Sequence, residues 1–185
     1  MLTALIVIGL LIVLVLWAVG IYNGLIRLRN LVQEAWRQID VELQRRHDLI
    51  PNLVETVKGY ATHEKGTFEE VTRARNMAVA PGSTVAEQAQ QENILTQALG
   101  RLIAVAEAYP DLKANQNFQQ LQQELTNTED RIAAGRRFYN ANVRDLNTKI
   151  EVFPGNIVAG MFGFKRADYF ETEDPAARQA PEVTF

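Results

Sequence analysis

The first part of the chain is apolar on every face of a helix. Residues 2–21 contain no charged side chain, and fourteen of these twenty residues are Leu, Ile or Val. A helix of this length rises about 30 Å, which matches the hydrocarbon core of a bilayer. At about −0.4 kcal/mol for each of those residues, insertion is favoured by roughly 6 kcal/mol. The pattern therefore predicts a transmembrane anchor over residues 1–22.

A cleaved signal peptide is the alternative interpretation of this run. Such a peptide has Lys or Arg before an apolar core of about 7–15 residues, followed by a small-x-small cleavage site. Here no Lys or Arg precedes the run, the run is longer, and Ala18–Gly20 is only a weak cleavage site. The chain has no Cys, so a lipoprotein anchor is excluded. We therefore expect the anchor to be retained.

The rest of the chain has a helical period. Apolar residues recur at steps of three and four, and no segment alternates as a strand would. Pro51 suggests a break, because proline disfavours helix at the preceding residue and suits the first turn of the next helix, which Asp48 could cap. The stripes predict helices over residues 23–47, 51–80, 84–109 and 112–150. We expect an all-α fold, in which a transmembrane helix continues into an antiparallel four-helix up-and-down bundle over residues 23–150.

The segment that follows is aromatic and rich in Gly and Pro. Residues 151–170 include Phe153, Phe162, Phe164, Tyr169 and Phe170. Aromatic surface of this extent requires burial, either on the bundle or on a neighbouring subunit or the membrane surface. Residues 171–185 carry four acidic side chains against one Arg, which predicts an acidic, disordered tail.

Charge beside the anchor predicts its orientation. Trp17 and Tyr22 suit the membrane interface, and Arg27, Arg29 and Arg37 follow them. The positive-inside rule then puts the bundle in the cytoplasm and the N-terminus outside, in a single-pass protein of a bacterial inner membrane. The net charge is −3 and there is no basic field, so no nucleic-acid partner is expected.

The sequence offers little for catalysis. His63–Glu64 begins like a zinc motif but has no second His four residues later, and Ser83 is the lone serine, in a predicted turn. We predict no catalytic residue, no metal and no cofactor. Arg45–Asp48 with Pro51 and Asn52 joins charge to a predicted turn. It is interpreted either as an ion-paired corner or as a recognition surface.

Several stretches resemble the LemA family of bacterial membrane proteins. The matching stretches are residues 22–30 (YNGLIRLRN), 35–41 (AWRQIDV), 45–61 (RRHDLIPNLVETVKGYA), 136–147 (RRFYNANVRDLN), Phe153–Pro154 and Phe162–Phe164. The resemblance covers nearly the whole chain and implies one span followed by a helical bundle. It carries no catalytic residue onto this sequence. It implies positions that fix the bundle or its interactions: Asn23, Arg29, Trp36, Asp40, Arg45, Arg46, Asp48, Pro51, Asn52, Tyr139, Asn140 and Phe164.

The anchor, the long apolar seams of the helices and the absence of a recognisable catalytic motif together favour a scaffold. We expect a membrane-anchored helical scaffold or adaptor that self-associates and organises membrane or partner proteins without catalysis. The resemblance also implies an alternative, a regulator or substrate-presenting partner of a membrane protease. A third hypothesis, an enzyme at the membrane surface, rests only on the Arg45–Asp48 cluster and His63–Glu64.

Overall fold

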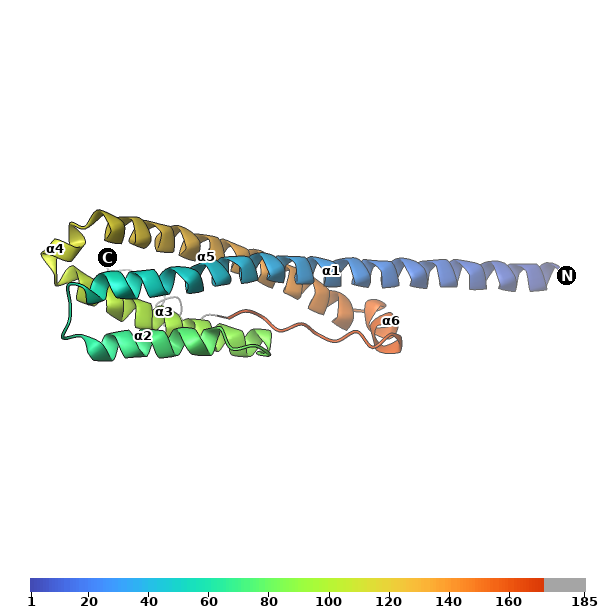
Figure 1. The fold of residues 1–185 in the computed structure, drawn as a ribbon. Coiled ribbons are helices and arrows are strands. Elements are labelled where there is room, and N and C mark those ends of the chain that lie inside the picture. The colour runs from blue at the N-terminus through green and yellow to red at the C-terminus, as the bar shows by residue number, and fades with distance from the viewer. Residues whose placement is uncertain (172–185) are drawn as a thin grey trace, which may run out of the picture. The chain divides into compact units, whose positions relative to one another are not determined.

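The computed structural model describes residues 1–171, and this part of the chain is helical without a strand (Figure 1). The helices are α1 (Leu2–Lys58), α2 (Lys65–Ala78), α3 (Val85–Glu107), α4 (Pro110–Lys113), α5 (Gln116–Glu151) and α6 (Gly155–Met161). The predicted all-α bundle with an apolar N-terminal helix is thereby confirmed. The acidic tail predicted over residues 171–185 lies outside the described residues from position 172 onward.

The chain forms two compact units. Unit 1 comprises Met1–Asp40 with Ala134–Asp168, and unit 2 comprises Val41–Ala133 and the described residues from Tyr169 on. Helices α1 and α5 are long enough to contribute to both units.

The core of unit 2 is built from the facing stripes of four helices. The C-terminal part of α1 buries Ile50, Leu53 and Val57, and its neighbours α2, α3 and α5 each bury a similar stripe. The stripe of α2 is Phe68, Val71, Ala74 and Ala78. That of α3 is Leu95, Ala98, Leu99, Leu102 and Ala106, and that of α5 is Phe118 and Leu125. Leu112 of the one-turn helix α4 closes the core at the connection from α3 to α5. Burial of these side chains at helical spacing holds the four helices together.

The predicted break between the first two helices is wrong. Helix α1 continues through Pro51 to Lys58, and the connection to α2 lies at residues 59–64 instead. Asp48 therefore caps nothing; it lies inside α1, where its carboxylate accepts a hydrogen bond from Gln44 at 3.2 Å. The apolar stripe hid the true turn, because Ala61 is buried within the turn and continues the spacing from Val57 to Phe68.

A side chain from α2 makes the continuous helix compatible with Pro51. Proline has no N–H, so the carbonyl of His47 loses its donor within the helix. Arg75 supplies the missing donor: its Nε donates to the His47 oxygen at 2.7 Å. A freed carbonyl inside a bundle is costly unless a partner is found, and the guanidinium provides one.

The start of α3 follows the sequence prediction. The Thr84 hydroxyl accepts a hydrogen bond from the Glu87 N–H at 3.2 Å, and the Glu87 carboxylate accepts from the Thr84 N–H at 2.7 Å. This is a capping box. The bond from the Thr84 backbone lowers the pKa of the Glu87 carboxyl. Gly82 before it has a φ of +91°, a conformation that glycine adopts without strain.

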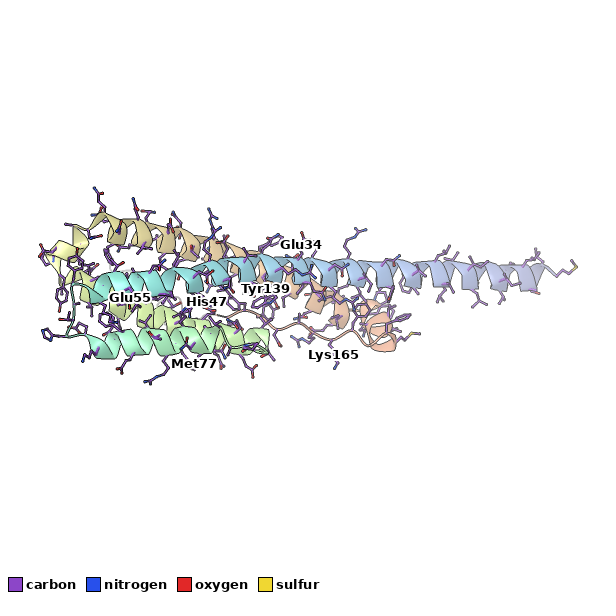
Figure 2. The ribbon with its side chains drawn as sticks, in the orientation of Figure 1. Glu34, His47, Glu55, Met77, Tyr139 and Lys165 are labelled. Atoms are coloured by element: carbon purple, nitrogen blue, oxygen red, sulfur yellow. The ribbon has the colours of Figure 1, made fainter. Side chains whose placement is uncertain are left out.

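Unit 1 pairs the N-terminal part of α1 with the C-terminal part of α5. Buried residues Ile21, Leu25, Val32, Ala35 and Ile39 form a stripe on α1. The helices approach closely where Gly135 meets Ile39, since a Cβ on that glycine would lie 3.1 Å from Cγ1. The Trp36 and Tyr139 rings are 5.5 Å apart between centroids. Before this stripe the side chains of α1 stand out on all sides, as Figure 2 shows.

Candidate functional site

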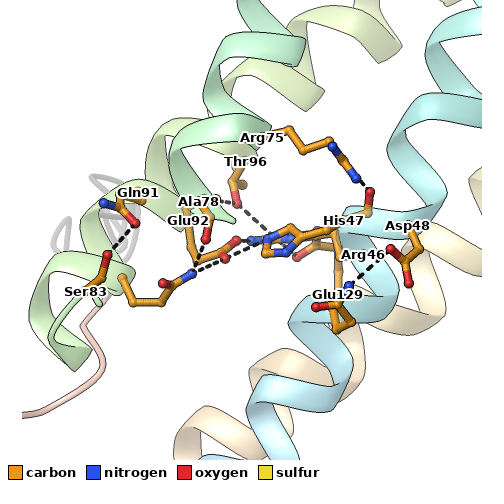
Figure 3. Close-up of polar contacts among 12 residues, drawn as sticks. Arg46, His47, Asp48, Arg75, Ala78, Ser83, Gln91, Glu92, Thr96 and Glu129 are labelled. Atoms are coloured by element: carbon orange, nitrogen blue, oxygen red, sulfur yellow. Dashed lines mark hydrogen bonds and ion pairs between the residues drawn. The ribbon is translucent and has the colours of Figure 1, made fainter. Parts of the chain in front are cut away.

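A cluster of charged side chains lies in unit 2; Arg46, His47 and Glu92 are buried, and Glu129 is partly exposed. Arg46 and His47 come from α1, Glu92 and Thr96 from α3, and Glu129 from α5 (Figure 3). Arg46 is 2% exposed and Glu92 is 4% exposed, which is rare for charged residues unless they are paired.

Glu92 connects two α1 side chains through its two carboxylate oxygens. Its Oε2 accepts from Arg46 Nη2, and its Oε1 lies 2.9 Å from His47 Nε2. Gln88 adds a further donor to Oε1 at 2.7 Å. The carboxylate is therefore hydrogen-bonded on both oxygens, as a buried charge requires.

Arg46 has a second acid partner. Its Nη1 donates to both oxygens of Glu129, at 2.8 and 3.0 Å, and to the Thr96 hydroxyl at 3.2 Å. Its Nε has no hydrogen-bond partner among the described residues. The guanidinium thus joins α1 to α3 and α5 by charge-assisted bonds.

These contacts shift the pKa values in the directions that favour ionisation. Burial alone would raise the pKa of Glu92, but the hydrogen bond with His47 and the charge of Arg46 outweigh burial, so the pKa is lowered. Burial alone would lower the pKa of Arg46, but Glu129 and Glu92 raise it. The cluster therefore holds fixed charges that stabilise each other.

The described groups of the cluster are engaged in contacts between helices. Its carboxylate and guanidinium groups are bonded mainly to each other, and the described residues contain no group of three His, Asp or Glu side chains placed to hold a metal ion. His63 is an exposed residue in the connection between α1 and α2. The arrangement is that of an internal clamp between helices.

A second cluster lies in unit 1, directly after the apolar run. The ring of Tyr22 lies 4.7 Å from Phe162 and 5.8 Å from Phe164, measured between centroids. The guanidinium carbon of Arg29 lies 5.5 Å from the Phe164 centroid, a cation–π distance. Two of the predicted aromatic residues are thus packed on α1 of the same chain.

The segment after α6 is fastened to α5. Asn147 forms two hydrogen bonds with the backbone of Ala167, one to its carbonyl and one from its N–H, both 2.9 Å long. The Tyr139 hydroxyl donates to the Asp168 carbonyl at 2.8 Å. Burial, with a smaller contribution from the Asp168 charge, raises the pKa of Tyr139 to about 12, so the hydroxyl keeps its proton at neutral pH.

The residues singled out from sequence fall into separate places. Tyr22, Arg29 and Phe164 meet, Trp36 meets Tyr139, and Arg46 is buried in the charge cluster. The others do not gather into one site. Trp17, Asn23, Arg27, Asp40, Arg45, Asp48, Pro51 and Asn52 are exposed, and Asn140 is half-buried. The Arg45–Asn52 group is not an interhelix corner, because α1 runs through it.

Sequence reasoning missed Glu92, Glu129, Arg75 and Asn147. The first three are ordinary charged residues of amphipathic helices, and their partners lie far away in sequence: 46 and 83 positions separate Glu92 and Glu129 from Arg46. The one usable signal is Glu92 itself, which lies three positions before buried Leu95 and so shares its helix face.

Helix α1 is, within residues 1–171, the one helix long and apolar enough to cross a membrane. Its mean hydropathy reaches 3.1 over the apolar window, and none of that window is buried in the structure. Helices that are apolar on every face require either a protein core or lipid around them.

Comparison with known proteins adds an independent finding. The model of the LemA family matches residues 35–185. Magnetosome protein MamQ 1 of Paramagnetospirillum magneticum is 30% identical over 88% of this chain and 68% of its own length. Protein LemA of Metamycoplasma hominis is 31% identical over 84% of this chain and 71% of its own length. The family-model match spans the residues of both the charge cluster and the aromatic segment 151–170.

Proposed function

The chain belongs to the LemA family, and from that premise we propose that it is a single-pass membrane-anchored helical scaffold or adaptor that works without catalysis. The observation that carries the proposal is the continuity of α1. One helix supplies a fully exposed apolar stretch of bilayer length and then the buried stripes of both units. Because the anchor and the core stripes share one helix, the folded part of the chain is attached directly to the membrane.

The buried charges support a structural role. Arg46, Glu92 and Glu129 are used to join helices, and each is engaged by another member of the cluster. A catalytic acid or base needs access to a reacting group, whereas Arg46 and Glu92 are almost fully buried and the partly exposed Glu129 is bonded to Arg46 through both of its oxygens.

Self-association is part of the proposal. Leu31 on α1 and Phe138 on α5 expose 37% and 52% of their surface within unit 1. Both side chains would be covered in a self-associated form. A second copy of the chain is the partner that is always present beside it.

Crosslinking in native membranes, followed by gentle extraction, tests the scaffold. We expect captured complexes that contain more than one copy of the chain or a fixed set of membrane proteins. A strictly monomeric chain with no captured partner would contradict the proposal. Capture of a membrane protease, with altered substrate turnover after deletion of the chain, would assign the regulatory role instead.

The proposed orientation puts the part of the chain that follows the apolar run in the cytoplasm of a bacterial cell. Its support is the positive charge of Arg27, Arg29 and Arg37 after the apolar run. The chain lacks cysteine, so a single Ala86→Cys substitution in the exposed first turn of α3 gives a clean reporter. In intact spheroplasts a membrane-impermeant thiol reagent should leave it unlabelled. Labelling before lysis would reverse the topology.

A further inference from the structure

We propose that α6 is a second membrane contact, a short helix that lies in the boundary between lipid headgroups and hydrocarbon beside the end of the transmembrane run. The inference rests on the proposed function, because it requires residues 2–21 to span a bilayer. Its partner is the lipid bilayer itself.

Helix α6 has two apolar faces, and only one is used inside the protein. Val158 and Ala159 are buried. Ile157 and Met161 are four residues apart in α6, so they share the other face, and they are 54% and 76% exposed. Phe153, which lies just before the helix, is 75% exposed. A face of this kind in water would be unfavourable and marks a docking surface.

The exposed face lies next to the proposed span. Phe162, directly after α6, contacts Tyr22, and Tyr22 is the first residue after the apolar run. Both belong to unit 1. If residues 2–21 occupy the hydrocarbon core, the ring contact puts the end of α6 at the depth of the interface, where Tyr and other aromatic residues are favoured.

The local fold keeps α6 at this position. Gly155 lies against the end of α5, where an added Cβ would come within 2.1 Å of the Lys149 carbonyl oxygen. The extended segment after α6 is held by the paired hydrogen bonds of Asn147 with Ala167. The outward face is therefore presented by a fixed helix.

Charge distinguishes lipid from a protein partner. The thirteen residues from Val152 to Phe164 contain no charged side chain, and Lys165 and Arg166 follow at once. Arg166 forms an ion pair with Glu151 at 3.0 Å, so Lys165 rather than Arg166 supplies the positive charge. Lys165 is exposed, and Figure 2 shows it on the segment after α6. Arg29 is held on Phe164, which brings another cation to this end. An apolar face beside cations suits acyl chains below anionic headgroups.

Depth-dependent fluorescence quenching tests the inference on the full chain. Met161→Cys, labelled with an environment-sensitive dye, is reconstituted in vesicles of phosphatidylcholine and phosphatidylglycerol that carry brominated lipids. Leu10→Cys serves as the control for the span. Gln38→Cys is the aqueous control, an exposed position about 25 Å further along α1 than Ile21.

We expect lipids brominated near the headgroup to quench the dye at Met161 strongly, and lipids brominated deep in the acyl chain to quench the dye at Leu10 strongly. The dye at Gln38 should be quenched little by either. Quenching at Leu10 but not at Met161 would overturn the inference and leave the proposed anchor intact. No quenching at Leu10 would overturn the anchor. Dye self-quenching at Met161 between copies, without lipid quenching, would assign the face to a second copy and also overturn the inference.

A second labelling site and a folding control keep the result interpretable. Ile157→Cys lies on the same exposed face, one helical turn earlier, and should give the same lipid quenching. Val158→Cys lies on the buried face and should give much less. Each labelled chain is first compared with the parent by circular dichroism, and equal quenching at Ile157 and Val158 would contradict the orientation of α6.

Discussion

Individual side chains of the buried cluster have roles that come from their partners. Glu92 compensates Arg46 and bonds His47 while nearly excluded from water. Removing one member of a buried ion pair leaves the other charge without compensation, which costs more than the pair itself contributes. The cluster is therefore a sensitive point for the stability of unit 2.

Glu92→Gln keeps the shape of the side chain and removes its charge. We expect the free energy of unfolding to fall by about 3 kcal/mol, since Arg46 then has only Glu129 to balance it. Urea denaturation followed by circular dichroism measures the change. Glu124→Gln, an exposed position on α5, is the matched control and should change stability by less than about 0.5 kcal/mol. Equal midpoints for both variants would contradict the prediction.

The lowered pKa of Glu92 gives the cluster a pH dependence of definite sign. The folded protein holds this carboxyl below the reference value of 4.5, so the unfolded chain takes up the proton first as pH falls. The stabilisation is complete above that value and is lost as pH drops through the folded pKa. The difference in unfolding free energy between the parent and Glu92→Gln should shrink on acidification below 4.5. A difference that stays constant would exclude this linkage.

The residue scale is also where sequence reasoning reached least far. The sequence singled out the group that contains Arg46 and His47. Charged residues near a proline have the same local pattern in an exposed turn between helices and in the buried part of one continuous helix. Burial of Arg46 depends on acids from α3 and α5, and local sequence does not specify that long-range pairing. The capping box of Thr84 with Glu87 was predictable because both partners lie within one turn.

At the scale of elements, the longest helix is the one that local rules divide wrongly. Proline inside a helix costs about 3 kcal/mol or more in isolation, and on that ground a break at Pro51 is reasonable. Helix α1 continues because Arg75 of another helix satisfies the freed carbonyl and because Ile50, Leu53 and Val57 are buried on both sides of the site. Tertiary packing thus overrides a local preference.

A double-mutant cycle tests this account of α1. Arg75→Met should destabilise the parent by about 1.5 kcal/mol, because the His47 carbonyl loses a charged donor. Pro51→Ala restores the N–H within the helix, so the same Arg75→Met change should cost about 1 kcal/mol less in that background. Chemical denaturation of the four chains gives the coupling. Additive effects would show that Arg75 stabilises α1 for another reason, and Arg73→Met provides the neighbouring exposed control.

The direction of α6 depends on one small residue. Gly155→Ala should disrupt the packing of α6 on α5 at a cost of about 2 kcal/mol, because the methyl group would overlap the Lys149 carbonyl. Gly160→Ala, in the same helix with nothing near its Cβ, should be neutral or slightly stabilising. Hydrogen exchange of the α6 amides measures both. Unchanged protection in Gly155→Ala would contradict the role assigned to this glycine.

At the scale of the whole molecule, the helical period and the apolar run specified the class of fold well. Four stripes at steps of three and four predict a bundle whatever their exact ends, because each stripe can be buried only against others. The outward face of α6 was not predictable, since an aromatic segment looks the same whether its rings pack inside the chain or outside it. Tyr22, Phe162 and Phe164 meet, while Phe153 faces outward.

Charge placed within the apolar run should release the whole chain from the membrane. Leu10→Arg with Leu14→Arg adds about 6 kcal/mol to the insertion free energy, which offsets the favourable sum estimated for the Leu, Ile and Val residues. We expect the variant to move into the soluble fraction after alkaline extraction, with the helicity of unit 2 retained. The Leu10→Ile and Leu14→Ile chain should stay in the membrane pellet. Retention of the arginine variant there would contradict the anchor, because an interfacial contact as short as α6 binds too weakly to withstand alkaline extraction.

Because the apolar run and the Ile21–Ile39 stripe belong to one unbroken helix, they share a single rotational phase. Each residue turns an α-helix by about 100°, so one alanine inserted between Ile21 and Leu25 would rotate every lipid-facing side chain by that angle with respect to α5, and four would leave a rotation of about 40°. If one face of the run binds a neighbour within the bilayer, the direction of that face is thus set by the number of residues at the junction. The number of residues at this junction therefore sets the rotational orientation of the transmembrane part of α1, and insertions or deletions there would rotate it.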